Sequence, residues 1–128
     1  MSDFKVPDII GTPFKYGGRP DDGSNTLDCY GLVQMVLNYN GIDLPERPYS
    51  KEKSIISLQM SMQMNEWELT ERQPGAVLLF RVKTILMHVG VVIDEFRFMH
   101  TWDKSGGVCV ERIADWEKRI AGVYRYVG

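Results

Sequence analysis

A single strong helical pattern followed by a run of short strand patterns is the feature that most restricts the fold of this chain. After Pro74-Gly75 the sequence consists of short β-branched or aromatic runs separated by turn residues. We expect strands over residues 76–82, 86–93, 96–102, 108–113 and 122–127. Helices first and strands afterwards are typical of an α+β domain, in which one helix packs on an antiparallel meander.

The helical pattern begins at Asp28, a residue type that caps helix N-termini. Apolar residues at positions 29, 32, 33, 36 and 37 fall on one helical stripe, and Asn40-Gly41 is a typical stop signal. Weaker patterns predict a short helix over residues 4–10, a second helix over residues 50–65 and a helical turn over residues 113–119.

Length, charge and hydropathy exclude several classes of protein. The 128 residues suffice for one compact domain spanning residues 1–128. Fifteen Lys and Arg against 17 Asp and Glu leave no evident basic face, so we expect no nucleic-acid partner. No apolar run approaches membrane-spanning length, and the first residues lack a signal-peptide pattern. We therefore expect no membrane insertion and synthesis in a cytoplasm without an export signal.

Two cysteines and two histidines offer the most chemistry. Cys29 and Cys109 lie far apart and neither belongs to a C-x-x-C pair, which argues against a zinc ribbon and a disulfide scaffold. Cys29 stands at the expected helix start, where free N–H groups and the helix dipole would lower the pKa of its thiol. His88 and His100 fall on successive predicted strands, and a hairpin between them would bring them close. The spacing makes a histidine dyad possible.

Each of these residues also has a purely structural interpretation. A free cysteine is often a small buried hydrophobe, and a strand histidine is often a satisfied core residue. Cys109 is interpreted as a packing residue, because no histidine or helix start lies near it in sequence. Tyr16 could fill the core with its ring, and the N-cap alone is a sufficient role for Asp28.

Five segments, in order, resemble the NlpC family of papain-like cysteine peptidases, which cut bacterial cell-wall peptides. The segments are Gly11-Thr12-Pro13-Phe14-Lys15-Tyr16-Gly17-Gly18, Asp28-Cys29-Tyr30-Gly31-Leu32-Val33-Gln34, Gln73-Pro74-Gly75, His88-Val89-Gly90-Val91-Val92 and Phe98-Met99-His100. The resemblance covers nearly the whole chain and implies a papain-like core. It implies that Cys29 is the nucleophile, that His88 is the general base and that His100 orients His88, with Tyr16 near the oxyanion site. It implies no metal and no organic cofactor.

Two positions depart from the family pattern. Tyr30 stands where members commonly have Ser, and in those enzymes this Ser and the preceding Asp help to hold the amine of a terminal L-alanine. The resemblance therefore implies Asp28 and Tyr30 as substrate-binding candidates, although Tyr30 is bulkier than Ser. Ala76 replaces the Asp of the family's Pro-Gly-Asp, a change in a supporting turn.

The small versions encoded by tailed bacteriophages and prophages are the members that this sequence resembles most, through Gly-Thr-Pro-Phe, Tyr-Gly-Gly-Arg and residues 115–126. That resemblance implies assembly into the virion tail with tail-tip proteins as partners, and action in the cell envelope as DNA enters. Our hypothesis is a cysteine endopeptidase that acts on peptidoglycan stem peptides. A non-catalytic tail assembly or docking module on the same fold stays open. So does a thiol amidase or acyltransferase, since water or an amine can resolve a thioester intermediate.

Overall fold

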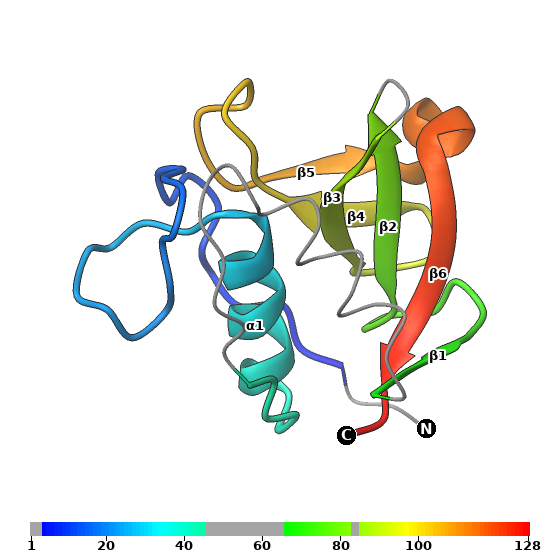
Figure 1. The fold of residues 1–128 in the computed structure, drawn as a ribbon, viewed down its shortest axis with the longest axis horizontal. Coiled ribbons are helices and arrows are strands. Elements are labelled where there is room, and N and C mark those ends of the chain that lie inside the picture. Colours follow the sequence, from blue (N-terminus) through cyan, green and yellow to red (C-terminus); the bar gives the residue numbers. More distant parts are fainter. Residues whose placement is uncertain (1–3, 46–65, 83–84) are drawn as a thin grey trace.

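A computed structural model describes residues 4–45, 66–82 and 85–128 of the chain. In this part of the chain one α-helix, α1 (Cys29–Tyr39), lies beside a six-stranded sheet in the order β1-β6-β2-β3-β4-β5 (Figure 1). The strands are β1 (Trp67–Leu69), β2 (Val77–Val82), β3 (Ile85–Val92), β4 (Arg97–His100), β5 (Cys109–Arg112) and β6 (Ile120–Tyr126). Every paired neighbour is antiparallel. The predicted α+β class, with a helix packed on an antiparallel sheet, is confirmed.

The meander prediction is confirmed for four of the five expected strands. Strands β2, β3, β4 and β5 follow one another in the sheet, whereas β6 returns to the opposite edge of β2. The 3-10 helix η2 (Ile113–Arg119) makes this return possible by leading the chain from β5 to β6. The sequence also gave no sign of β1, which has three residues and pairs with β6.

Two further helix predictions have different outcomes. The prediction of a helix over residues 4–10 is wrong. This segment is not helical and forms hydrogen bonds with distant parts of the chain instead. The Lys5 N–H donates to the Asn40 side chain at 2.7 Å, and the Gly11 N–H donates to the Val108 carbonyl at 2.9 Å. The second expected helix, residues 50–65, lies outside the described residues. No helix among the described residues is long and apolar enough to cross a membrane.

Helix α1 forms where the sequence pattern placed it. Asp28 is the N-cap and its side chain accepts a hydrogen bond from the Gly31 N–H at 2.8 Å. The buried stripe of the helix consists of Leu32, Val33, Val36 and Leu37. These residues pack against β3 and β4, in one core with Val89, Val91 and Met99. The first turn of α1 is thereby fixed against β3.

The other face of the sheet carries a second, aromatic core. Phe80 from β2 and Phe98 from β4 pack there with Ile113 and Trp116 of η2. Because neighbouring residues of a strand point to opposite faces, residues 88, 90 and 92 of β3 and residues 98 and 100 of β4 face this aromatic core, while residues 89, 91 and 99 face α1. His88 and His100 therefore lie on the aromatic side.

Candidate active site

The loop of residues 11–28 is held against the start of α1 by Asp28. Asp28 is 2% exposed, and its carboxylate accepts hydrogen bonds from the Gly17 N–H at 2.9 Å and the Arg19 guanidinium at 2.7 Å, besides capping α1. A Cβ at Gly31 would lie 2.2 Å from the Gly18 carbonyl oxygen. Only glycine at position 31 therefore lets the loop cross the first turn so closely.

Cys29 is the first residue of α1 and is partly buried. The backbone N–H groups of Val89 and Tyr30 lie close enough to its sulfur to favour the thiolate form. Burial raises the pKa of the Cys29 thiol to about 12, and the negative charge of Asp28 adds to this, while the two N–H groups and Arg19 act in the other direction. The expectation of a lowered thiol pKa is therefore wrong for this resting arrangement, because burial outweighs the helix start.

The two histidines meet, as the sequence permitted. His88 Nε2 lies 2.7 Å from His100 Nδ1, and both side chains are buried. In the sheet Val91 pairs with Met99 and Val92 with Phe98, so the hairpin brings both rings to the same face. Gly90 makes room for this contact, because a Cβ there would lie 3.1 Å from the His100 Cβ and 3.0 Å from the Phe98 ring.

A third residue, Glu111, extends the histidine pair. Glu111 Oε2 lies 2.7 Å from His100 Nε2, and Trp116 Nε1 donates to the other carboxylate oxygen at 3.2 Å. Sequence reasoning missed Glu111, since a lone glutamate near the end of an edge strand is usually a solvated residue. Its position two residues after Cys109, and so on the same face, was the available signal.

The carboxylate fixes the direction of the hydrogen bonds. Glu111 accepts only, so the proton between it and His100 sits on His100 Nε2, and His100 Nδ1 is left as an acceptor. His88 Nε2 must then donate to His100, which leaves the lone pair of His88 on Nδ1. The chain Glu111–His100–His88 thus holds His88 in the tautomer whose Nδ1 can take a proton.

Aromatic rings surround the His88 imidazole. The Phe80, Trp102 and Trp116 rings lie with their centroids 5.4, 5.6 and 6.1 Å from that of His88. Burial, with a further effect of His100, holds the pKa of His88 well below its usual value. Burial also lowers the pKa of His100, although the hydrogen bond and charge of Glu111 oppose this. Both rings are therefore neutral near pH 7, as a general base requires.

Cys29 lies near the backbone of the strand that carries His88. The Val89 N–H that favours the Cys29 thiolate belongs to the residue directly after His88. Among the described residues no hydrogen bond joins the sulfur to the His88 ring itself. Contacts between nucleophile and base are often longer in ligand-free enzymes and tighten with substrate. The roles of Cys29, His88 and His100 remain predictions. The described contacts join His88 to His100, and they bring Cys29 to the backbone beside His88.

The predicted substrate-binding residues differ in their surroundings. Tyr16 is 41% exposed, and its pKa is raised first by burial and then by the nearby acidic groups Asp103, Cys29 and Asp28. Tyr30 is 2% exposed, and its hydroxyl donates to the Pro45 carbonyl at 2.6 Å. The structure thus gives Tyr30 a packing role, whereas Tyr16 faces solvent beside the thiol.

Comparisons with known proteins found a family match and similar sequences. The model described as the NlpC/P60 family matches residues 11–125. The chain is 28% identical over 115 residues to the murein DD-endopeptidase MepS/murein LD-carboxypeptidase of Escherichia coli K12, covering 88% of this chain and 54% of that protein. It is 25% identical over 118 residues to the probable endopeptidase p60 of Listeria innocua, covering 91% of this chain and 22% of that protein. The chain thus spans about half or less of these relatives.

A solved structure also resembles the fold. The protein described as similar to a lipoprotein of the NLP/P60 family, from Staphylococcus aureus, superimposes with a TM-score of 0.65 at 20% identity. The match covers 93% of this chain and 38% of the other. At this identity the likeness concerns the fold, and it supports the helix-on-sheet architecture described above.

Proposed function

The chain belongs to the NlpC/P60 family, and on that premise we propose that it is a cysteine endopeptidase that cleaves peptide bonds in peptidoglycan stem peptides. The observation that carries the proposal is the hydrogen-bonded chain of His88, His100 and Glu111 beside the helix start that holds Cys29. The relatives named as murein and p60 endopeptidases support the substrate class.

The proposed reaction begins with two neutral partners. Because the resting thiol and the His88 imidazole are both uncharged, the proton leaves Cys29 for His88 Nδ1 as the sulfur attacks the scissile carbonyl, rather than beforehand. The resulting imidazolium is stabilised through His100 by the Glu111 carboxylate. It then protonates the leaving amine, and water hydrolyses the thioester with His88 again as base.

The oxyanion would be held at the start of α1. The start of α1 carries the positive end of the helix dipole, and we place Tyr16 beside it as a hydrogen-bond donor. Capture of a substrate amine by Asp28 is a weaker part of the proposal, because Gly17, Arg19 and Gly31 already donate to its carboxylate. We propose that Asp28 shapes the site chiefly by holding the loop.

The test uses purified sacculi. Wild-type protein is expected to release new muropeptides, detected by mass spectrometry, and Cys29→Ala is expected to release none. Tyr39→Ala is the matched control, since Tyr39 lies exposed at the far end of the same helix. Identical digests from wild type and Cys29→Ala would overturn the proposal.

The cellular setting is a further part of the proposal. On the motif resemblance alone, we propose that the protein is made in a host cytoplasm, joins the tail-tip proteins of a phage or prophage virion, and acts in the cell envelope. Mass spectrometry of purified virions would find the chain if this is right, and its absence from virions of a phage that encodes it would refute the setting.

A non-catalytic docking module is the second candidate, and two observations favour it. The Cys29 thiol has a raised pKa, and Tyr30 fills the position next to it with a buried ring. This alternative expects intact tail assembly and infection with Cys29→Ala. A thiol amidase or acyltransferase would instead lose activity with Cys29→Ala but give a different product mass, because another acceptor or bond is used.

A further inference from the structure

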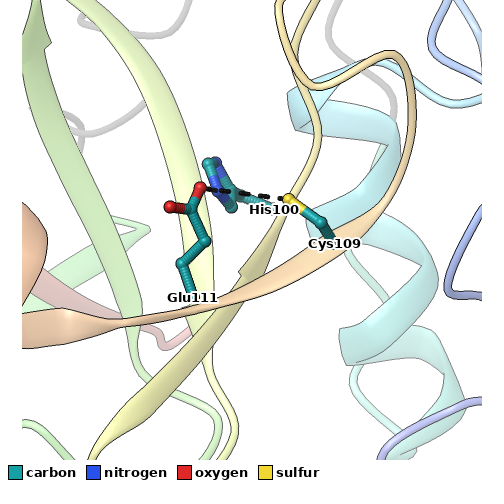
Figure 2. A group of neighbouring side chains, drawn as sticks. All are labelled: His100, Cys109 and Glu111. Carbon is teal, nitrogen blue, oxygen red and sulfur yellow. Dashed lines mark hydrogen bonds and ion pairs between the residues drawn. The ribbon is translucent and has the colours of Figure 1, made fainter.

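Three potential metal ligands converge at the outer end of the histidine chain. His100 on β4 pairs directly with Cys109 on β5, and Glu111 follows two residues later on the same face (Figure 2). One ligand atom from each residue lies within 4.8 Å of the other two. Cys109 Sγ is 3.9 Å from Glu111 Oε2, which in turn is 2.7 Å from His100 Nε2.

The chemistry and spacing of this group suit Zn²⁺. A thiolate, an imidazole nitrogen and a carboxylate are the ligand types that zinc takes, at bond lengths of about 2.0–2.3 Å. Tetrahedral geometry at those lengths separates ligand atoms by about 3.3–3.8 Å. The sulfur–oxygen distance of 3.9 Å would have to shorten slightly, and the His100–Glu111 distance of 2.7 Å would have to open by less than about 1 Å.

Charge and access also favour a divalent ion here. The Cys109 thiolate and the Glu111 carboxylate would together neutralise the charge of Zn²⁺. This favours binding at a half-buried site, because an unpaired charge is costly to bury. Trp116 Nε1 bonds Glu111 Oε1 and leaves Oε2 for the ion, the kind of outer contact that orients a ligand. The Glu111 side chain is 37% exposed, so an ion can enter and keep a water as its fourth ligand.

We propose that His100, Cys109 and Glu111 form a Zn²⁺ site whose occupation turns the peptidase off. The binding part stands on this geometry alone, whereas the inhibition part rests on the proposed function. Zinc replaces the proton on His100 Nε2, so the neutral His100 ring must carry its proton on Nδ1 and becomes the donor to His88. His88 Nε2 then accepts, its proton sits on Nδ1, and the ring can no longer take the proton of Cys29.

The protons balance in this switch. Zinc binding removes one proton from the Cys109 thiol and one from His100 Nε2. The proton between the two rings passes from His88 Nε2 to His100 Nδ1, and His88 Nδ1 gains one from solvent. One proton is therefore released per ion bound, with no oxidant or reductant involved.

The binding experiment uses Cys29→Ala, which removes the other thiol and any zinc held there. Titration with Co²⁺ as a spectroscopic substitute should give a thiolate-to-metal absorption band, and Zn²⁺ should displace it. Adding Cys109→Ala or Cys109→Ser to this background should abolish the band and weaken Zn²⁺ binding by about 100-fold or more. Equal Zn²⁺ affinity with and without the Cys109 thiol, in variants with unchanged circular dichroism, would overturn the site.

The inhibition experiment compares each protein with itself. The rate at which the wild type releases muropeptides should fall as free Zn²⁺ rises and recover when a chelator is added. In Cys109→Ser the ratio of the rates with and without Zn²⁺ should change far less. Equal inhibition of both would place the inhibitory zinc at Cys29 instead and refute the switch. If no protein digests sacculi, the proposed function fails, and the Co²⁺ band in Cys29→Ala still decides the metal site.

Discussion

Replacing Glu111 by Gln tests the hydrogen-bond chain at its outer end. Gln keeps the size of Glu but removes the charge, and its amide can accept from His100 through oxygen or donate through nitrogen. A hydrogen bond to a charged group contributes about 1.5–3 kcal/mol, and the partial exposure of Glu111 argues for the lower value. A loss of about 1.5 kcal/mol from the stabilisation of the His88 imidazolium corresponds to an approximately tenfold lower kcat.

The assay follows release of a defined muropeptide product and separates kcat from KM. Because Glu111 lies behind the histidines, Glu111→Gln is expected to lower kcat with KM little changed. Glu68→Gln is the matched control, since Glu68 lies on β1 and pairs only with Arg125 among the ion pairs described at the surface. A kcat for Glu111→Gln within twofold of the control value would refute the reasoning that the carboxylate sets the tautomer.

Three other perturbations follow from the same contacts. Gly31→Ala should lower the free energy of unfolding by about 2–3 kcal/mol in urea titrations, because its Cβ would meet the Gly18 carbonyl; helix propensity alone predicts a gain instead. Burial holds the pKa of His88 well below 6.5, so between about pH 7.5 and about pH 5.5 His88 gains a proton in the unfolded chain only. The free energy of unfolding should therefore fall by about 1.4 kcal/mol over this range. His88→Gln should remove that share of the pH dependence, so an unchanged slope would contradict it. Arg19→Gln should lower the melting temperature measured by calorimetry, because it breaks the buried ion pair with Asp28. An unchanged melting temperature would show that this ion pair does not contribute to stability.

Local signals in the sequence predicted the helix and the meander because each depends on neighbouring residues. Asp28 as cap and the apolar stripe behind it define α1, and the β-branched runs define the central strands. The position of β6 depends on pairing with a strand some 40 residues earlier, which no local pattern encodes. The wrong helix over residues 4–10 has the same cause, since Lys5 bonds distant Asn40.

The site was partly predictable for a related reason. Motif context predicted Cys29, His88 and His100 as site residues, and strand alternation correctly allowed the two histidine rings to share a face. The raised thiol pKa was not foreseen, because burial of Cys29 results from packing of the whole loop on the helix. Glu111 was missed because its importance comes from the pairing of β4 with β5, which brings it to His100.

The most direct test of the account is to trap the acyl group on Cys29. Protein mixed with a purified stem-peptide substrate is quenched in acid within the first turnovers, digested, and analysed by mass spectrometry. The account predicts that the peptide containing Cys29 gains the mass of the acyl half of the substrate, and that Cys29→Ala shows neither this adduct nor product. Continued product release by Cys29→Ala would contradict it.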